Sequence, residues 1–265
     1  MTAASAPAAT HAKANLVELF SAIQGEGAIV GTRQIFVRFA RCDLRCHYCD
    51  SAHTWKTNHL CRLEKTPGVR DFEFLPNPIT ADVLLAAIAR QDCPHLHDSI
   101  SLTGGEPLLH AKFLQAFLPQ LRDRVRLPIY LESGGHRPYD LQLVLPYLDL
   151  IGMDVKLPSV SGESRWEAHR SFLTQCHGAG VDVFVKAIVA ARTDIADLRQ
   201  LARLVAAIDP QIPVYLQPVT TLAVPHAETI VPPSPEQVLT WQTQLKQSLA
   251  SVRVVPQTHK AIGQL

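Results

Sequence analysis

Three closely spaced cysteines are the clearest sign of chemistry in this sequence. Cys42, Cys46 and Cys49 have the spacing C-x₃-C-x₂-C and follow an apolar run over residues 35–39. Four thiolates fill the coordination of a [4Fe–4S] cluster. Three thiolates leave one iron open, and an open metal position is where substrate or cofactor chemistry takes place, as at catalytic zinc sites. The cysteines therefore predict an enzyme with a reactive cluster.

Zinc is the main alternative metal for these thiols. Zinc sites usually combine C-x₂-C pairs with a second pair or with histidines, and His47 lies too close to two of the cysteines to belong to a separate pair. The remaining cysteines, Cys61, Cys93 and Cys176, are scattered, and we interpret them as structural thiols. Disulfide frameworks belong to small secreted domains, so the pattern favours a reducing cytoplasm.

Length and composition favour one well-filled domain. The chain has 265 residues, of which 47% are hydrophobic and 18% charged, and its formal net charge is +1. A charge this small argues against a nucleic-acid binder, which carries a basic stripe. No apolar run reaches the ~18–20 residues that cross a bilayer. Residues 1–14, rich in Ala, Ser, Thr and Pro, lack the features of a secretory signal, and we expect a disordered tail there.

Strands and helices alternate along the chain from residue 79 onward. We expect strands at 16–20, 35–39, 99–102, 128–131, 148–155, 181–189, 213–217 and 252–255, and helices at 81–90, 111–122, 139–145, 163–176, 195–208 and 235–248. Such units predict an α/β fold with a parallel sheet covered by helices, wound by right-handed crossovers into a full or partial barrel. Residues 53–78 show no steady periodicity and are expected to be an irregular insertion in a single domain, 15–265.

Polar segments follow the predicted strands at the point where each strand ends. They are the cysteine loop and residues 103–107, 132–135, 154–156, 186, 217–218 and 256–260. In α/β barrels the carboxyl ends of the strands build the active site. We therefore expect these segments to meet at one rim of the sheet.

The segment Thr103-Gly104-Gly105-Glu106-Pro107 adds a second motif. Its glycines allow a close approach of the backbone to a ligand, and Glu106 can accept hydrogen bonds from an ammonium group. An ordinary strand-to-helix turn would also account for this segment alone. Together with the cysteine spacing it resembles the radical S-adenosylmethionine superfamily, whose glycine-rich turn holds the methionine amino group. That resemblance implies a 5′-deoxyadenosyl radical, generated in a site from which the protein excludes water.

Gln24-Gly25-Glu26-Gly27 and Arg38 indicate a flat, nitrogen-rich substrate that carries a carboxylate. An amide and a carboxylate can form paired hydrogen bonds with an amidine-like N–H edge. Arg38 points to the opposite strand face from Val37 and Phe39, where it can bind a carboxylate bidentately. A glycine turn with solvated side chains and a surface arginine are the alternatives.

Over almost its whole length the chain resembles the 7-carboxy-7-deazaguanine synthase family of that superfamily. The matching stretches are residues 20–27, 31–50, 103–109, 185–186, 215–218 and 252–260. The resemblance implies a lyase that converts 6-carboxy-5,6,7,8-tetrahydropterin to 7-carboxy-7-deazaguanine with loss of ammonia, in queuosine and deazapurine biosynthesis. It also implies a [4Fe–4S] cluster, S-adenosylmethionine, Mg²⁺, an electron donor such as flavodoxin or ferredoxin, and a cytoplasmic homodimer.

Carried over by motif, the resemblance predicts three groups of site residues, with the substrate radical generated by S-adenosylmethionine rather than by a catalytic side chain. The residues expected to contact substrate are Ile23, Gln24, Gly25, Glu26, Arg38, Thr103, His259 and Leu265. Those expected to contact S-adenosylmethionine are Tyr48, Gly104, Gly105, Glu106, Ser133, Asp154, Val155, Lys156, Gln217 and Pro218. The expected metal ligands are Cys42, Cys46 and Cys49 for the cluster and, where the family usually has threonine, Ser51 for Mg²⁺.

Some features leave alternatives open. The family commonly has Ser-Pro-Lys where this chain has Asp154-Val155-Lys156, and Asn in the turn at 132–135. The sequence ends six residues after His259, and we expect this end to fold over the active site. One rival function is a glycyl-radical-enzyme activase, which would not need Gln24, Glu26 or residues 256–260. Others are a cluster-bearing electron-transfer or regulatory protein, and a related radical enzyme for another pterin- or purine-like substrate.

Overall fold

A ten-stranded sheet organises the molecule. The structure, a computed structural model, describes residues 12–220 and 230–264. The strand order in the sheet is β12-β11-β10-β9-β8-β7-β3-β2-β4-β5. The strands are β2 (Leu16–Ile23), β3 (Arg33–Phe39), β4 (Leu60–Glu64), β5 (Phe72–Pro76), β7 (Ser99–Gly104), β8 (Ile129–Ser133), β9 (Leu150–Asp154), β10 (Asp182–Val189), β11 (Val214–Pro218) and β12 (Val252–Val254).

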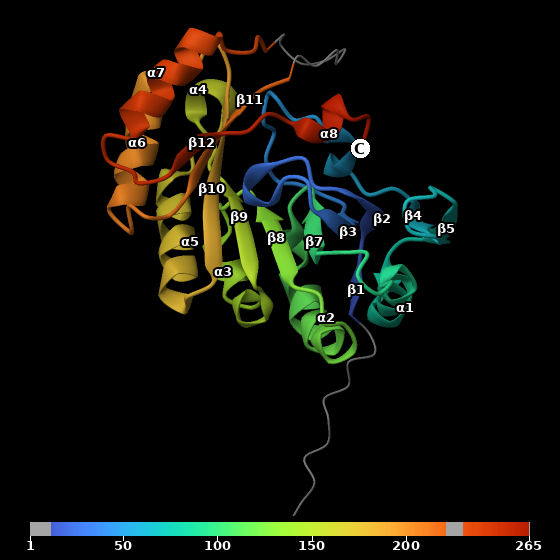
Figure 1. Ribbon diagram of the computed structural model, residues 1–265. Coiled ribbons are helices and arrows are strands. Elements are labelled where there is room, and N and C mark those ends of the chain that lie inside the picture. The colour runs from blue at the N-terminus through green and yellow to red at the C-terminus, as the bar shows by residue number, and fades with distance from the viewer. Residues whose placement is uncertain (1–11, 221–229, 265) are drawn as a thin grey trace, which may run out of the picture.

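Every neighbouring pair from β3 to β12 is parallel, which confirms the predicted α/β architecture. In the described residues β12 and β5 are the two ends of the sheet, so the sheet curves without closing into a full barrel. Figure 1 shows α1, α2, α3, α5 and α6 following one another along one side of this sheet, with α8 on the other side. The helices are α1 (Ala81–Gln91), α2 (Ala111–Arg124), α3 (Pro138–Leu141), α4 (Pro158–Ser161), α5 (Trp166–Ala179), α6 (Ile195–Ala206), α7 (Pro235–Leu245) and α8 (Thr258–Ala261).

Local sequence signals explain where several elements begin and which face they bury. The side chain of Thr80 accepts a hydrogen bond from the Val83 amide and caps α1, as its residue type predicts. In β3, Val37 and Phe39 are fully buried while Arg38 is not, because successive strand residues point to opposite faces. The buried face of β3 packs in the main hydrophobic core between the sheet and the helices.

The prediction of irregular structure after the cluster loop was wrong. Residues 60–76 form the antiparallel pair β4–β5, and β4 adds to the sheet beside β2. In β4, Cys61 and Leu63 are buried while Leu60 and Arg62 are exposed. This alternation is only four residues long, and the prolines, glycines and charges around it obscure the strand in the sequence.

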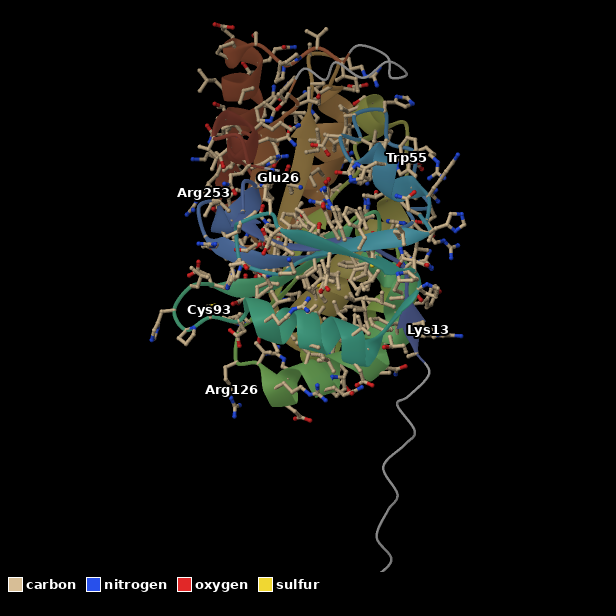
Figure 2. All side chains as sticks on the ribbon, turned by 90° about the vertical axis from the view of Figure 1, so that its right-hand side faces the viewer. Lys13, Glu26, Trp55, Cys93, Arg126 and Arg253 are labelled. Atoms are coloured by element: carbon tan, nitrogen blue, oxygen red, sulfur yellow. The ribbon has the colours of Figure 1, made fainter. Side chains whose placement is uncertain are left out.

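The predicted disordered tail, residues 1–14, includes two residues that form a strand. Residues 1–11 lie outside the described part of the chain. Lys13–Ala14, however, form strand β1, which pairs antiparallel with β6 (Ile79–Thr80). The prediction of disorder was therefore wrong for these two residues. Figure 2 shows Lys13 at the edge of the molecule, next to the first described residue.

Different connecting segments lie at the two ends of the parallel strands. Figure 2 shows Glu26 and Trp55 toward one end of the molecule, and Cys93 and Arg126, from the connections that lead into β7 and β8, toward the other. The end with Glu26 lies beyond the carboxyl ends of the parallel strands, where parallel sheets place their active sites. None of the described helices is long and apolar enough to cross a membrane.

Candidate active site

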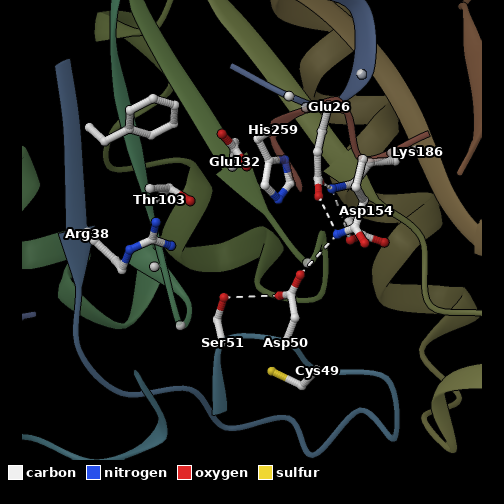
Figure 3. Close-up of a pocket in the computed structure, with 18 of the residues that line it drawn as sticks. Glu26, Arg38, Cys49, Asp50, Ser51, Thr103, Glu132, Asp154, Lys186 and His259 are labelled. Carbon is white, nitrogen blue, oxygen red and sulfur yellow. Dashed lines mark hydrogen bonds and ion pairs between the residues drawn. The ribbon is translucent and has the colours of Figure 1, made fainter. Parts of the chain in front are cut away.

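The predicted site residues gather around one cavity of about 500 Å³ at the carboxyl ends of the strands. The predicted residues that line it are Ile23, Gln24, Gly25, Glu26, Arg38, Cys42, Cys46, Tyr48, Cys49, Ser51, Thr103, Gly104, Gly105, Glu106, Ser133, Asp154, Lys156, Gln217 and His259. These residues come from segments spread over most of the chain. The expected convergence of polar segments at one rim is thus confirmed (Figure 3).

Three predicted residues are not among those that line the cavity. Val155 is fully buried in the core, and its amide donates to the carbonyl of Lys186. Pro218 is half-buried and follows Gln217, whose side chain lines the cavity. Both neighbours of Val155 line the cavity, so backbone alternation turns Val155 away from it. Leu265 lies outside the described residues.

The three cysteines follow β3 in a loop that leaves their thiols partly or fully buried. Burial raises the pKa of the Cys42 thiol to about 11, and it raises the pKa of Cys46 and Cys49 as well. Thiolates in such a place need a cationic partner, and iron ligation supplies one. Arg45 supports the loop by donating to the carbonyls of Cys42 and Leu44 at 2.8 and 2.6 Å. The donor set therefore fits a three-cysteine cluster.

The glycine turn at the end of β7 lies directly against the cysteine loop. A Cβ on Gly105 would lie 2.2 Å from the carbonyl oxygen of Arg41, and Gly104 has φ +132° with similar crowding against Phe39. Only glycine allows the two backbones to come this close. The turn delivers Glu106 into the cavity as a nearly buried carboxylate.

Glu106 is held firmly by its own surroundings. Its carboxylate accepts hydrogen bonds from the Ser133 hydroxyl at 3.0 Å, the Gly134 amide at 2.9 Å and the Leu108 amide at 3.1 Å. Each carboxylate oxygen has more than one lone pair. Glu106 can therefore keep these contacts and still accept from an ammonium group in the cavity.

Several residues that line the cavity carry buried polar atoms without a hydrogen-bond partner among the described residues. They are the hydroxyl of Tyr48, Oδ1 of Asp154 and both polar atoms of the Gln217 amide. Buried polar groups are normally paired, and each exception calls for a partner. A ligand with nucleoside-like donors and acceptors would supply that partner, so these residues fit the S-adenosylmethionine site that the sequence predicts.

Next to Asp154, the cavity is lined by a network of charged and amide groups. The Gln24 amide donates to Glu132 at 2.8 Å and to Gln34 at 3.2 Å. Glu26 forms an ion pair with Lys186, whose ammonium also lies 3.5 Å from Asp154. Figure 3 shows Glu26, Lys186 and Asp154 grouped together, with Glu132 nearby.

The two glutamates of this network have opposite pKa shifts. Burial raises the pKa of Glu132, an effect that Lys186 opposes and the nearby Glu26 adds to. Burial acts in the same direction on Glu26, but the attraction of Lys186 and hydrogen bonds from Lys186 and Gln257 lower its pKa overall. Glu26 is therefore held as a carboxylate, whereas Glu132 more readily keeps a proton. Two carboxyl groups with diverging pKa values suit different roles in one reaction.

Arg38 reaches the cavity from β3, as its strand position predicts. Its Nε donates to Glu18 at 2.8 Å, and its guanidinium lies 5.3 Å from the centroid of the Phe20 ring. Glu18 also binds Arg62 at 2.5 Å. Since one edge of Arg38 is fixed by Glu18, its terminal nitrogens can bind a carboxylate without a large loss of side-chain entropy. Figure 3 shows its guanidinium close to Thr103.

The C-terminal segment covers the loop that carries Gln24 and Glu26. The amide of Thr258 donates to the Gly25 carbonyl at 3.0 Å, and the Ile23 amide donates to the Gln264 side chain at 3.3 Å. A Cβ on Gly25 would lie 2.2 Å from Nδ1 of His259. This packing supports the expectation that the end of the chain folds over the active site, as far as Gln264.

A cluster of oxygen and nitrogen donors lies beside Ser51. Glu26, Asp50 and His259 each offer an atom within 4.8 Å of the others. The Ser51 hydroxyl donates to Oδ1 of Asp50 at 3.1 Å. Burial would favour protonation of Asp50, but Lys260, together with hydrogen bonds from its neighbours, holds its pKa at about 2. These oxygen donors are of the type that Mg²⁺ prefers, so the residues fit a magnesium ion near Ser51.

Sequence reasoning did not assign site roles to Glu132, Lys186, Asp50 and Gln257. Glu132, Lys186 and Gln257 belong to the polar segments that follow predicted strands, which is the signal that could have identified them. Gln257 donates to Glu26 at 2.8 Å and to Asp50 at 2.9 Å, contacts between segments more than 200 residues apart. Glu18, which fixes Arg38, lies on the neighbouring strand β2 at a paired position.

The open α/β fold and the three-cysteine loop indicate an iron–sulfur protein, and comparisons with known proteins agree. Residues 23–160 match a family described as a 4Fe-4S single cluster domain. The fold is similar to that of QueE from Escherichia coli, with TM-score 0.59 and 20% identity over 93% of this chain and 95% of that one. It is also similar to a radical SAM methyltransferase from Sphaerobacter thermophilus, with TM-score 0.57 and 15% identity over 90% and 77% of the two chains. The fold is that of the radical S-adenosylmethionine proteins.

Closer relatives define the family. The chain is 40% identical to the 7-carboxy-7-deazaguanine synthase of Geobacter sulfurreducens over 95% of its own length and 98% of the relative. It is 32% identical to the enzyme of the same name from Methanocaldococcus jannaschii over 94% and 99% of the two chains. The chain belongs to the 7-carboxy-7-deazaguanine synthase family.

Proposed function

We propose that the chain is a radical S-adenosylmethionine lyase that converts 6-carboxy-5,6,7,8-tetrahydropterin to 7-carboxy-7-deazaguanine. One observation carries this proposal: Gln24, Glu26 and Arg38 line the same cavity as the three cysteines, in a chain of the synthase family. Substrate and product differ by one molecule of ammonia, so the reaction needs no net oxidant. Residues 15–265 would work as a single domain.

The cofactor side would bind and orient two groups. When bound, the cluster and S-adenosylmethionine supply the one-electron chemistry that removes hydrogen from the substrate carbon bearing the carboxylate. Cys42, Cys46 and Cys49 would ligate three irons and leave the fourth open. Glu106 would accept hydrogen bonds from the methionine ammonium. The polar atoms without a partner on Tyr48, Asp154 and Gln217 would hydrogen-bond the nucleoside part of S-adenosylmethionine.

The substrate side would hold the pterin by both ends. Gln24 and Glu26 would bind the amidine-like ring edge, because a carboxylate held ionised by Lys186 is a strong acceptor. Arg38 would bind the substrate carboxylate through its terminal nitrogens. Oε1 of Glu132 accepts from Gln24 and Ser101, so a proton on this carboxyl would reside on Oε2 and could be donated as ammonia departs.

Several finer properties are part of the same proposal. Ser51 would contribute its hydroxyl to Mg²⁺, with Asp50 and the substrate carboxylate supplying further oxygen ligands. An acidic one-electron carrier such as flavodoxin or ferredoxin would reduce the cluster. A cytoplasmic setting suits a cluster with an open iron, and the chain would act as a homodimer.

One anaerobic assay tests the proposal. The protein is reconstituted with iron and sulfide and incubated with dithionite, S-adenosylmethionine, Mg²⁺ and the carboxypterin, and product is followed by mass spectrometry. We expect 7-carboxy-7-deazaguanine, with a Cys46→Ala variant giving none. Deoxyadenosine without the deazaguanine would favour a related enzyme for another pterin- or purine-like substrate. No deoxyadenosine with any substrate would favour an electron-transfer protein.

A further inference from the structure

The loop after β8 contacts both the cofactor carboxylate and the cluster loop. We name residues 133–137 the 133–137 clasp. At its first end, the Ser133 hydroxyl and the Gly134 amide donate to Glu106. At its other end, His136 and Arg137 contact Asp43. Asp43 lies between the first two cluster cysteines, so the clasp joins two segments that are about sixty residues apart in sequence.

The contacts to Asp43 fix both of its carboxylate oxygens. Nε2 of His136 lies 2.8 Å from Oδ1, and Nη1 of Arg137 lies 2.7 Å from Oδ2. Arg137 is oriented in turn by Asp140, whose carboxylate lies 2.7 Å from its Nη2. With a partner on each oxygen, the Asp43 carboxylate is held in one orientation. A paired carboxylate of this kind restricts the loop on which it lies.

His136 is the one clasp side chain that faces both carboxylates among the described contacts. Its Nδ1 lies 3.7 Å from Oε2 of Glu106, a distance suited to an electrostatic contact rather than a hydrogen bond. The His136 side chain is only 4% exposed, and its Nδ1 has no hydrogen-bond partner among the described residues. A Cβ on Gly134 would lie 2.8 Å from this Nδ1, so glycine is what lets the ring sit against Glu106.

The Glu106 amide donates directly to the Arg41 carbonyl at 2.9 Å, which fixes the backbone of this turn against the cluster loop. We infer that His136 is a positioning residue that sets where the Glu106 carboxylate lies relative to the cluster loop. The inference rests on the proposed function, because it takes Glu106 as the acceptor of the methionine ammonium and the cysteine loop as the cluster site. S-adenosylmethionine must reach the open iron and Glu106 at once. A bridge that fixes the Glu106 carboxylate relative to the loop preorganises this two-point binding and lowers the entropy that binding costs.

A purely structural ion pair would behave differently from a positioning residue. It would change the stability of the apoprotein without changing the affinity for S-adenosylmethionine. Two variants separate these roles. His136→Gln keeps a donor near the position of Nε2, facing Asp43, and lacks the ring nitrogen that faces Glu106. Asp43→Asn keeps an oxygen acceptor for the ring and removes the charge that anchors it.

A matched control uses another histidine–carboxylate pair. His177 lies 3.9 Å from Asp209 on the surface and is not among the residues that line the cavity. His177→Gln changes the same residue type in the same way. Each reconstituted protein is measured for iron content, for the Kd of S-adenosylmethionine by anaerobic equilibrium dialysis, and for the change that S-adenosylmethionine causes in the electron paramagnetic resonance spectrum of the reduced cluster. The melting temperature of each apoprotein reports folding.

We expect His136→Gln and Asp43→Asn to bind normal amounts of iron, with the Kd of S-adenosylmethionine raised about tenfold, as for a coupling of ordinary size between contacting groups. The spectral change on cofactor addition should be smaller, and His177→Gln should match the wild type in all readouts. A Kd within twofold of wild type and an unchanged spectral response in both clasp variants would overturn the inference. If His136→Gln does not fold, the Kd and the spectral response of Asp43→Asn test the inference by the same thresholds. Failure of the proposed function would be seen in the wild type itself, as absence of a cluster, of cofactor binding or of the deazaguanine product.

Discussion

In the part of the cavity where we propose that the cofactor binds, the cofactor side, several buried polar atoms have no partner among the described residues. In the part proposed for the substrate, the substrate side, the charged groups are already paired with one another. Tyr48 and Gln217 belong to the first kind. Glu26 and Lys186 belong to the second, as do Gln24 and Glu132. The cofactor would therefore bind to polar atoms that have no other partner. The substrate would instead replace existing ion pairs and hydrogen bonds with its own.

This difference affects specificity. A site with unpaired buried groups gains affinity from any ligand that supplies the missing hydrogen bonds. A site of paired charges gives high affinity only to a ligand whose donors and acceptors match well enough to replace the internal pairs. The substrate side is thus suited to discriminate between related ring systems. The cofactor side is suited to bind one constant nucleoside.

The largest effect should come from removing the charge at the centre of the substrate network. Glu26→Gln removes the strongest ion pair of Lys186 and leaves Asp154, at 3.5 Å, as its remaining ion-pair partner among the described residues. We expect KM for the carboxypterin to rise about 100-fold, and the free energy of unfolding to fall by about 2 kcal/mol. The Kd of S-adenosylmethionine should stay the same. Steady-state kinetics, equilibrium dialysis and urea unfolding measure the three quantities.

The control for this change is Glu73→Gln, which breaks a partly exposed ion pair with Arg90 between two residues that do not line the cavity. Exposed pairs contribute little, so this variant should match the wild type in kinetics. An equal rise in KM for substrate and Kd for cofactor in Glu26→Gln would contradict the division of the cavity into two sides.

A smaller effect should follow from separating the C-terminal segment from the substrate loop. Gly25→Ala places a Cβ 2.2 Å from His259 and 2.5 Å from its backbone nitrogen, so the segment must move. We expect KM for the carboxypterin to rise about tenfold, because a displacement of about 1 Å disturbs substrate positioning. Gly178→Ala is the matched control, since a Cβ there meets no atom within 4 Å. Unchanged turnover and KM in Gly25→Ala would show that the C-terminal segment does not shape the substrate site.

The partnerless amide of Gln217 offers a direct test of the cofactor side. Gln217→Leu removes two buried polar atoms that no described residue satisfies. The apoprotein should keep or gain stability, while the Kd of S-adenosylmethionine rises about fivefold for one lost neutral hydrogen bond. Gln91→Leu is the contrast, because the Gln91 amide donates to the Glu64 carbonyl at 2.7 Å and its loss should destabilise the fold. A Gln217→Leu protein that is destabilised but binds cofactor normally would argue for a hidden structural partner.

The smallest effect concerns the proton on Glu132. Its pKa is raised in the folded protein above the usual value of 4.5. The unfolded chain therefore loses this proton first as pH rises, and the wild type loses stability above pH 4.5 that Glu132→Gln does not lose. We expect the stability of the variant relative to wild type to increase as pH rises above 4.5, measured by thermal unfolding of the apoproteins between pH 4 and 8. A difference that is constant with pH would show that Glu132 ionises normally.

The local motifs of the site could be predicted from the sequence because their residues are close together. The cysteine spacing and the Thr103–Pro107 turn each lie within one loop, and the structure places both at the cavity. Arg38 was correctly assigned to the face opposite Val37 and Phe39 because strand alternation is a local rule. The same rule, applied to residue 155, would have turned its side chain away from the cavity.

The charge network could not be predicted because its partners are far apart in the sequence. Gln24 and Glu132 are 108 residues apart, and Glu26 and Lys186 are 160 apart. Such pairings depend on strand order, which the sequence indicates only as a general architecture. The β4–β5 hairpin was missed for a different reason, since its short alternation lies between segments rich in turn residues.

The measurement that tests the central claim most directly is spectroscopy of the anaerobically reconstituted, reduced protein with and without S-adenosylmethionine. Three cysteine ligands and one open iron predict about four irons per chain, and an electron paramagnetic resonance spectrum that changes when the cofactor binds. Bound zinc, no iron–sulfur signal, or a cluster spectrum that S-adenosylmethionine leaves unchanged would contradict the account.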